Sequence, residues 1–161
     1  MKKYLLLLSL VILSSSCTEE IKFNNPAFQT LKNNVFWRAQ NYNAFLNEDG
    51  GLIIVGQLGY EKVTLRSTST NEKTYMLGLN NFSTASYSNS LQGQLADFST
   101  GVNKGSGQIV ITEYDSEANT VSGTFRFSAI NADNEEVDLS TINFTEGVFY
   151  KIPLTFSSLE K

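Results

Sequence analysis

The sequence predicts one all-β domain, an antiparallel β-sandwich or barrel-like fold of about 8–10 strands, that follows a cleaved lipoprotein signal peptide. Two observations predict the fold. Apolar residues recur at every second position, and the apolar runs are short and separated by Gly, Asn, Asp and Ser. A third observation sets the first residues apart, because they combine a basic head with an apolar run. Patterning does not distinguish a sandwich from a closed barrel, so both architectures stay open.

Residues 1–16 have the three parts of an export signal. Lys2 and Lys3 form a short basic head, residues 5–13 (LLLLSLVIL) form an apolar run, and three serines follow at residues 14–16. A helix of this apolar length reaches about 13 Å, which is less than half of the ~30 Å hydrocarbon layer of a membrane. We therefore expect the segment to be removed rather than retained as a membrane span.

Cys17 directly follows these small residues. The arrangement resembles a bacterial lipobox, which implies cleavage before the cysteine and a thioether-linked diacylglycerol on its thiol. A lipobox usually has Leu three residues before the cysteine, where this chain has Ser14 after Leu13. Two alternatives stay open: ordinary signal peptidase cleavage, which would leave a free thiol, and a buried core position for Cys17. At about 0.8 kcal/mol per buried CH₂, two or three acyl chains would hold the domain stably on a membrane.

Thr18, Glu19 and Glu20 follow the cysteine immediately. Acidic residues at this position resemble the signal by which Bacteroidetes lipoproteins reach the outer face of the outer membrane, and a solvated spacer is the alternative. The chain has 16 acidic and 12 basic residues, and loss of Lys2 and Lys3 would make it more acidic still. Dispersed negative charge argues against nucleic acid or anionic headgroups as partners, because both need clustered Lys and Arg.

The mature chain has a single composition boundary. Residues 21–29 form a short polar connector that contains Pro26. We expect residues 17–29 to be the lipidated N-terminus and tether. Residues 30–161 are expected to be one β domain, because neither a second linker nor a repeat of about 20–50 residues is present. A helical turn or two is considered only for residues 26–34, where the final two asparagines would end it.

Alternation of apolar and polar residues defines the expected strands. The clearest case is residues 121–129, and residues 108–114 (QIVITEY) precede it across a turn-rich segment, which predicts a hairpin. Residues 52–58 (LIIVGQL) are typical of a central strand covered on both faces. The other expected strands lie at residues 36–39, the first of the domain, and at 62–66, 75–79, 142–144 and 148–154, with Pro153 at an edge or a strand end.

The scarcity of His and Cys excludes several kinds of catalytic and metal site. With no His and one Cys, the chain has no Ser-His-Asp or Cys-His nucleophile system, His-ligated zinc, intramolecular disulfide or iron–sulfur site. We expect no cofactor, no metal site and no enzymatic activity. Aromatic residues make up 12% of the chain. In an outward-facing cleft, Trp37, Tyr42, Tyr60 or Tyr87 would stack against sugar rings or a peptide, and a core position is the alternative, favoured for Trp37.

Two groups of acidic residues have a spacing that suits a cation. Asp115, Glu117 and Asn119 alternate as Ca²⁺ ligands do in a loop, but Arg126 stands where an EF-hand needs its bidentate acid, so a hairpin turn is favoured. Four carboxylates lie within residues 133–138, and a charged connector is favoured over a cation site.

Two further patterns, a carboxylate pair and a glycine-containing segment, have no second feature in the sequence that supports a functional site. Glu113 with Asp115 or Glu146 forms a formal carboxylate pair for glycoside hydrolysis, but Glu113 lies at an expected strand end, where a solvated acid is ordinary. Residues 101–107 (GVNKGSG) lack the order of a phosphate-binding loop and the helix that follows one, so they predict a plain loop.

An ordered set of short segments resembles a domain-of-unknown-function family of small Bacteroidetes lipoproteins. The resemblance implies an outer-membrane lipoprotein with a single β domain and no assigned activity, and it transfers no catalytic residue. The segments are residues 25–29 (NPAFQ), 36–39 (FWRA), 51–56 (GLIIVG), 74–78 (TYMLG), 107–115 (GQIVITEYD), 121–127 (VSGTFRF) and 147–153 (GVFYKIP).

These observations lead to one expectation for function and three alternatives. We expect a domain anchored to the outer membrane through the lipid on Cys17, facing the cell exterior, that acts as a non-enzymatic binding or accessory module for a glycan, peptide or envelope-protein partner. A structural or assembly subunit of an outer-membrane complex would instead expose a contiguous apolar patch. A lipocalin-like carrier of apolar ligands would have a closed barrel with an internal cavity. A hydrolase would place two acids about 5–10 Å apart in a cleft.

Overall fold

The computed structural model of the chain describes residues 25–131 and 141–155. The all-β fold predicted from the alternating pattern is confirmed, because these residues form eleven strands and no helix. Within the two described ranges, no helix that could span a bilayer is found. The strands are β1 (Ala27–Lys32), β2 (Val35–Arg38), β3 (Asn41–Leu46), β4 (Leu52–Leu58), β5 (Glu61–Ser67), β6 (Thr74–Leu77), β7 (Thr84–Asn89), β8 (Ala96–Ser99), β9 (Ser106–Asp115), β10 (Thr120–Asn131) and β11 (Thr141–Pro153).

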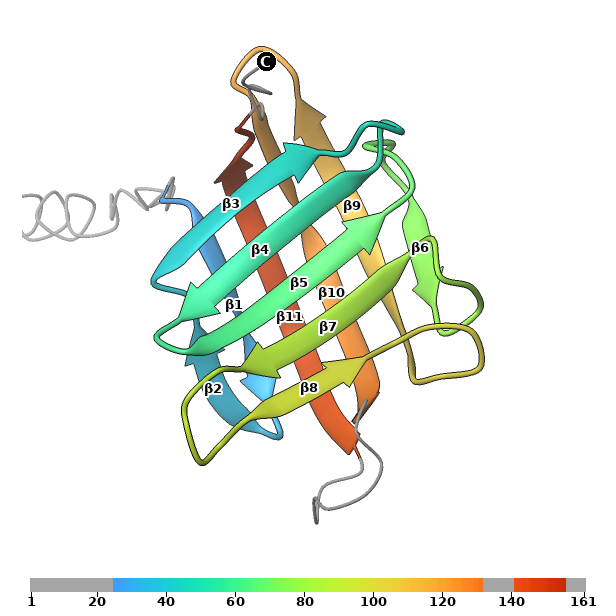
Figure 1. Cartoon of the computed structure of the whole chain (residues 1–161). Helices are drawn as coiled ribbons and strands as arrows, with labels where there is room; N and C mark the ends of the chain where they lie inside the picture. The colour runs from blue at the N-terminus through green and yellow to red at the C-terminus, as the bar shows by residue number, and fades with distance from the viewer. Residues whose placement is uncertain (1–24, 132–140, 156–161) are drawn as a thin grey trace, which may run out of the picture.

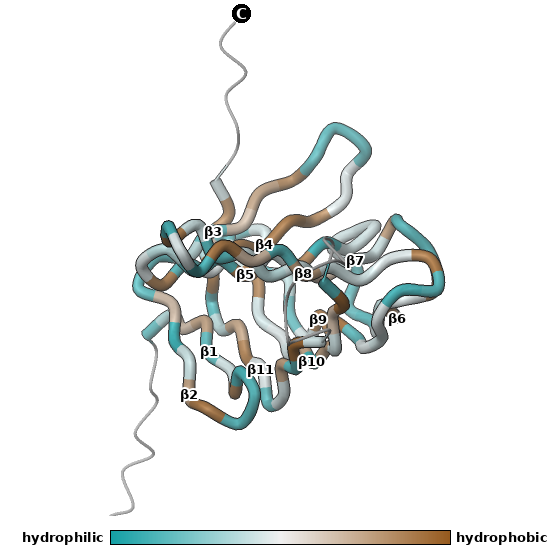
Figure 2. Tube along the Cα trace, turned by 60° about the horizontal axis from the view of Figure 1, so that its bottom comes forward, coloured by the Kyte–Doolittle hydropathy of each residue, from teal (hydrophilic) through white to brown (hydrophobic). Residues whose placement is uncertain are grey.

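The strands form one strongly curled antiparallel sheet (Figure 1). Its hydrogen-bonded order is β2-β1-β11-β10-β8-β7-β5-β4-β3, while β9 pairs with β10 and β6 pairs with β9. The sheet folds over into a layer of β3, β4, β5, β7 and β8 and a layer of β2, β1, β11, β10, β9 and β6, which the turned view in Figure 2 separates. β10 joins the layers, because it pairs with β9 and, through Ile130 and Asn131, with β8. The result is a half-barrel.

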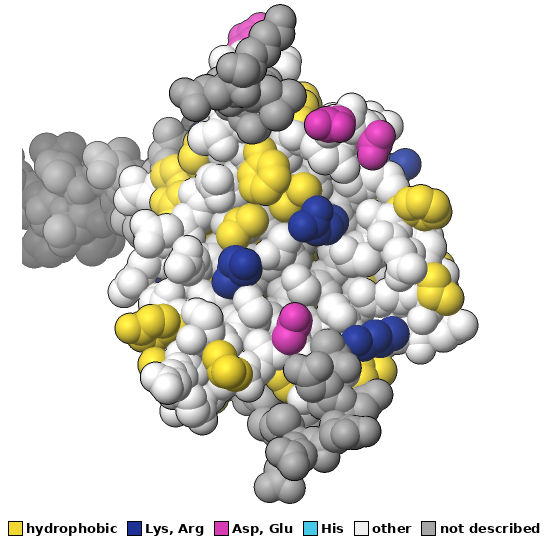
Figure 3. All heavy atoms as spheres, viewed as in Figure 1, with side chains coloured by type: hydrophobic (Ala, Val, Ile, Leu, Met, Phe, Trp, Pro, Cys, Tyr) yellow, Lys and Arg dark blue, Asp and Glu magenta, His cyan; other side chains and the backbone are white. Residues whose placement is uncertain are grey.

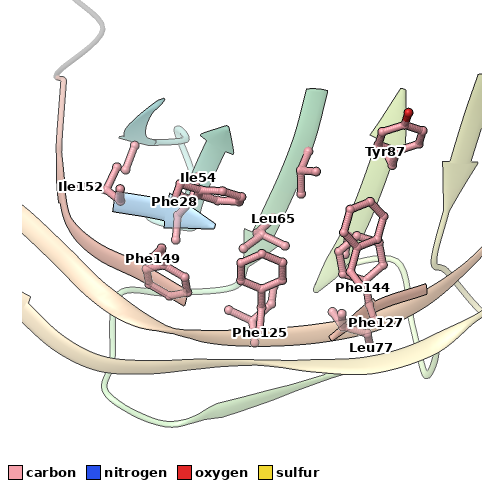
Figure 4. Close-up of a cluster of buried hydrophobic side chains, with 14 of the residues drawn as sticks. Phe28, Ile54, Leu65, Leu77, Tyr87, Phe125, Phe127, Phe144, Phe149 and Ile152 are labelled. Atoms are coloured by element: carbon pink, nitrogen blue, oxygen red, sulfur yellow. The ribbon is translucent and has the colours of Figure 1, made fainter. Parts of the chain in front are cut away.

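Aromatic and aliphatic side chains fill the space between the layers (Figure 4). The ring centroids of Phe28 and Phe125 are 5.1 Å apart, and those of Phe127 and Phe144 are 4.5 Å apart. The side chains of Phe28, Phe144 and Phe149 are fully buried. An aromatic side chain buries about 150–250 Å² at roughly 25 cal/mol per Å², so these rings supply much of the hydrophobic stabilisation of the fold.

The local strand predictions are confirmed in several places. The expected hairpin is β9–β10, in which Asp115 pairs with Thr120 across the turn. β4 lies between β3 and β5, and Ile53 and Ile54 are both buried although they point to opposite faces. β11 ends at Pro153, which has no backbone N–H for a further ladder bond.

Two β-bulges bend the longest strands around the core. The register between β10 and β11 shifts between Phe125 and Phe127 and again between Val121 and Gly123. At these places β11 contains an extra residue, first Glu146 and then Lys151, with φ angles of 52° and 48°. A bulge increases the local right-handed twist, so the two shifts help to curl the sheet into a half-barrel.

Two expectations near the start of the domain are corrected. The segment considered for a helical turn forms β1, because Phe28 and Thr30 point into the core and the strand pairs with β11. This tertiary pairing overrides the local preference. Asn33 and Asn34 then form a two-residue hairpin turn, with φ angles of 48° and 65°, so residues 36–39 lie on and just after the second strand rather than the first. β1 therefore begins inside the segment expected to be a tether.

Several sequence predictions fall outside the described residues. The signal peptide, Cys17 and the Thr18-Glu19-Glu20 segment lie within residues 1–24, and the acidic residues 133–138 lie within residues 132–140. These predictions stay predictions.

Gly123 on β10 provides a test of the packing between β10 and β11. A Cβ added there would collide with the Val110 carbonyl oxygen and the Phe149 ring. We predict that Gly123→Ala lowers the free energy of unfolding by about 1–3 kcal/mol, measured by urea denaturation. Thr124→Val, on the exposed face of the same strand, is the matched control and should change it by less than about 0.5 kcal/mol. Equal stability of Gly123→Ala and the unmodified chain would contradict this packing.

Candidate functional site

A cluster of four side chains connects the two layers at one end of the half-barrel. Lys32 ends β1, Trp37 lies on β2, Glu61 begins β5 and Tyr87 lies on β7. Lys32 is four residues after the buried Phe28 on the same strand, so its side chain points to the inner face. Glu61 directly follows the β4–β5 turn, which places its carboxylate at the same end.

The Glu61 carboxylate is the centre of this cluster. Its Oε1 accepts hydrogen bonds from Lys32 Nζ, with which it forms an ion pair, and from the Tyr87 hydroxyl at 2.8 Å. Its Oε2 accepts a hydrogen bond from Trp37 Nε1 at 2.5 Å. The Lys32 and Glu61 side chains are 23% and 22% exposed, so water reaches the pair only in part. Both carboxylate oxygens are therefore satisfied by groups of the chain itself.

Two pKa values respond to this arrangement. Burial by itself raises the pKa of the Glu61 carboxyl, but the hydrogen bonds from Lys32 and Tyr87, the Lys32 charge and the Trp37 N–H together lower it below its ordinary value. Burial, the hydrogen bond to Glu61 and the negative charge of Glu61 raise the pKa of the Tyr87 hydroxyl. The lowered pKa keeps Glu61 ionised as an acceptor, and the raised pKa keeps the Tyr87 hydroxyl protonated as a donor. The cluster therefore acts as a bridge between the layers rather than as a vacant site.

A groove of about 350 Å³ lies on the outer face of the second layer. Arg126 on β10 pairs with Gln108 on β9, which pairs in turn with Met76 on β6, so the three side chains form a row across the strands. The Arg126 Nη2 donates a hydrogen bond to Gln108 Oε1 at 3.3 Å. The rest of the lining combines the amide and hydroxyl side chains of Ser106, Ser128, Asn143 and Thr145 with Gly107, Phe127 and Phe144.

The groove continues into a second hollow of about 480 Å³. The two hollows share Gln108 and Arg126, and the second adds Gln29, Thr124 and the bulge residue Glu146, among others. Together they form a surface of mixed polar and apolar character that crosses β6, β9, β10 and β11 and reaches β1. Such a surface offers many hydrogen-bond donors and acceptors, one cation and one carboxylate, which suits reversible binding of a polar ligand.

The structure separates the four aromatic residues expected to stack on a ligand. Trp37 and Tyr87 are 2% and 4% exposed and belong to the Glu61 cluster, so neither presents a ring face to solvent. Tyr42 packs against the core, and its hydroxyl donates to the Pro26 carbonyl oxygen at 3.0 Å. Tyr60, at the β4–β5 turn, is 62% exposed. None of the four lines the groove at Arg126.

The acidic candidates are positioned by turns and strand ends. Asp115 Oδ1 accepts the backbone N–H groups of Glu117 and Ala118 at 2.9 and 2.8 Å, which is the geometry of a hairpin turn. Glu113 accepts a hydrogen bond from the Ser122 hydroxyl at 3.2 Å. In the described ranges, no three His, Cys, Asp or Glu side chains come together in a way that would hold a metal ion. Of the glycine-containing residues 101–107, the last two already belong to strand β9, so the segment leads into a strand rather than into a helix.

Sequence reasoning did not find the Glu61 cluster or the groove. Lys32 had one usable signal, because it continues the inward alternation of Phe28 and Thr30. The sequence placed Arg126 within the expected strand at residues 121–129 and at the position where an EF-hand needs an acid, and it placed Gln108 at the start of the preceding strand. Their juxtaposition depends on strand register, which the sequence does not display.

The Glu61 cluster predicts a pH dependence of stability. A carboxyl whose pKa is lowered by folding stabilises the protein above its unfolded pKa and loses this contribution as the pH falls through the folded value. We predict that Glu61→Gln lowers the free energy of unfolding by about 1–2 kcal/mol at neutral pH, and that this difference shrinks below about pH 4.5. Urea denaturation followed by the fluorescence of Trp37, the single Trp of the chain, measures both.

The matched control for this substitution is Glu117→Gln, in the exposed turn before β10. It should leave the stability unchanged at both pH values. A Glu61→Gln effect that is small, or that is the same at neutral and acid pH, would contradict the bridging role.

Comparison with known proteins gives a family and nothing more specific. No curated protein and no solved structure matches this chain significantly. A family model described as "Domain of unknown function (DUF6252)" matches residues 24–153, a range that begins just before β1 and ends with β11. The match covers most of the chain, and the protein therefore belongs to the DUF6252 family.

Proposed function

We propose that this protein is a lipid-anchored, non-enzymatic binding module of the outer membrane that holds an acidic glycan in the groove at Arg126. The observation that carries the proposal is the composition of the groove, in which a guanidinium lies beside amide and hydroxyl side chains on a lining that also includes apolar residues such as Met76. A volume of about 350 Å³ lies within the ~300–1,000 Å³ range of small-ligand sites.

The chemistry of the lining favours this ligand class. Arg126 donates one hydrogen bond to Gln108 through Nη2, and a guanidinium has five N–H donors, so a fork remains for a carboxylate. Asn143, Ser128 and Thr145 offer partners for sugar hydroxyls. Glu146 is the one carboxylate among the lining residues of the two hollows, whereas glycoside hydrolysis uses two. Binding without turnover is the role that this set of groups supports.

The anchor rests on the sequence. Cys17 follows an export signal and small residues in a lipobox-like arrangement, and Thr18, Glu19 and Glu20 stand where surface-exported Bacteroidetes lipoproteins have acidic residues. The proposed location is therefore the outer membrane, with the domain facing the cell exterior.

A structural or assembly subunit is a second candidate function. The observation that favours it is a group of exposed apolar side chains at one end of the half-barrel, which includes Val35, Phe36 and Tyr60. The lipocalin-like carrier has no comparable support, because aromatic rings fill the space between the layers.

Arg126→Gln should weaken glycan binding without unfolding the protein. We predict that the detergent-solubilised lipoprotein binds a glucuronate-containing tetrasaccharide more tightly than a neutral tetrasaccharide, and that Arg126→Gln weakens this binding at least about tenfold, which is about 1.4 kcal/mol. Isothermal titration calorimetry measures both affinities. Arg66→Gln, at an exposed position of β5 in the other layer, is the matched control and should bind as the unmodified chain does.

The outcomes separate ligand classes. Preference for an acidic peptide over the tetrasaccharide would replace the glycan by a peptide. No binding of either probe would overturn the binding role of the groove.

Cys17→Ala should abolish lipidation. We predict that the unmodified chain incorporates radiolabelled palmitate and fractionates with the outer membrane, whereas Cys17→Ala does neither, because the acylated thiol is lost. Protease added to intact cells should digest the anchored domain. Equal labelling of the two chains would overturn the anchor, and full protection from protease would place the domain in the periplasm.

A further inference from the structure

Four large apolar side chains are exposed at the turns of one end of the half-barrel. Val35, Phe36, Tyr60 and Leu95 are 66%, 63%, 62% and 70% exposed. They come from three connections: the start of β2 after the β1–β2 turn, the β4–β5 turn, and the β7–β8 loop. We call these four residues the apolar rim.

Hydrogen bonds bring the three connections together. Trp37 Nε1 bonds to Glu61, which ties the β1–β2 hairpin to the residue after Tyr60. The Ser90 N–H, in the β7–β8 loop, donates to the Tyr60 carbonyl oxygen at 3.1 Å, which ties that loop to the β4–β5 turn. The β1–β2 hairpin is therefore tied to the Glu61 cluster, and the β7–β8 loop is tied to the neighbouring turn at Tyr60.

The N-terminal chain enters the domain at the start of β1, about 20 Å along that strand from Val35 and Phe36 at its other end. The Pro26 carbonyl oxygen accepts a hydrogen bond from the Tyr42 hydroxyl, and Tyr42 pairs with Gly56, four residues before Tyr60. Figure 1 shows β1 beginning on the same side as the β4–β5 turn. Cys17 stands nine residues before Pro26. At ~3.3–3.6 Å per residue, the chain between them spans at most about 30 Å.

We propose that the apolar rim rests on the surface of the lipid bilayer that carries the anchor, an inference that rests on the lipidation of Cys17 in the proposed function. A tether of this length keeps the rim within reach of the bilayer. Phe36 and Leu95 would enter the acyl boundary and Tyr60 would lie at headgroup level, as amphipathic aromatic side chains do. The charges at this end balance, because Lys32 pairs with Glu61 and the exposed Lys62 and Asp97 offset each other, so a zwitterionic surface fits the rim.

A second copy of the chain fits the rim less well. Four partly exposed side chains at separate turns offer less than the about 800 Å² per partner of a standard interface. Insertion of a few apolar tips into a bilayer has no such size requirement.

The opposite end of the half-barrel supplies a matched comparison. Leu79 and Phe82 in the β6–β7 loop are 70% and 77% exposed, so they match Leu95 and Phe36 in type and exposure. They adjoin the far end of β5, where Arg66 pairs with Thr84, and a strand of that length separates the two ends by about 20 Å. Figure 3 shows hydrophobic side chains at both the lower-left and the right margins of this face.

A fluorescent probe placed at each end tests the proposal. The chain has one Cys, and lipidation consumes its thiol, so an introduced Cys is the single reactive thiol of the lipoprotein. Phe36→Cys and Leu95→Cys, with Phe82→Cys and Leu79→Cys as controls, are labelled with an environment-sensitive dye. The labelled lipoproteins are reconstituted into phosphatidylcholine–phosphatidylethanolamine vesicles that contain a nitroxide lipid. We predict at least about twofold stronger quenching at the two rim positions than at the two controls.

The outcomes distinguish this proposal from the anchor. Vesicle-bound, singly labelled chains with equal quenching at both ends would overturn the rim contact and leave the anchor intact. Double labelling, with chains that do not float with the vesicles, would overturn the anchor and the rim contact together. Protection of the rim dyes from iodide in detergent, with a dimer by light scattering, would assign the rim to a second copy and overturn the lipid contact.

Discussion

The carboxylate of Glu61 holds together parts of the half-barrel that backbone pairing leaves apart. Among the described strands, β1 and β2 pair with neither β5 nor β7, so the layers have no ladder at this end. Three donors, from Lys32, Trp37 and Tyr87, meet on the two Glu61 oxygens and close the gap. On the β1–β2 hairpin itself, the Phe28 ring packs edge-on against Trp37, with centroids 6.0 Å apart. A partly exposed ion pair adds little by itself, but here it fixes the hairpin that covers the core.

The aromatic core and the bulges depend on each other. Phe125, Phe127, Phe144 and Phe149 lie on β10 and β11, and their rings fit because the sheet curls around them. Glycine at position 123 leaves room for the Phe149 ring on the facing strand. The same bulge that bends β11 beside Arg126 places Glu146 in the outer hollow. The shape of the groove is therefore a consequence of how the inner face is packed.

Local patterning was sufficient for several of the strands and insufficient for β1 and for the sites. The β9–β10 hairpin was predictable because its signal, alternation on both sides of a turn-rich segment, lies within residues 108–129. The strand at the start of the domain was missed, because β1 is stabilised by β11, more than 100 residues later. The Lys32–Glu61 bridge joins residues 29 apart that no local period relates. Bulge positions carried no compositional signal, since Glu146 and Lys151 are uncommon at positive φ.

The groove and the rim meet at the β1–β2 turn. Asn143, which lines the groove, exchanges hydrogen bonds with Asn33 in that turn: its N–H donates to Asn33 Oδ1 at 2.9 Å, and its carbonyl oxygen accepts the Asn33 N–H at 2.8 Å. From there the groove runs across β10 and β9 to Met76 on β6, away from the rim. A bilayer at the rim would therefore approach one end of the groove and leave the other end open. This arrangement suits a ligand that extends along the cell surface, because the domain would hold it beside the membrane rather than at the far end of a long tether.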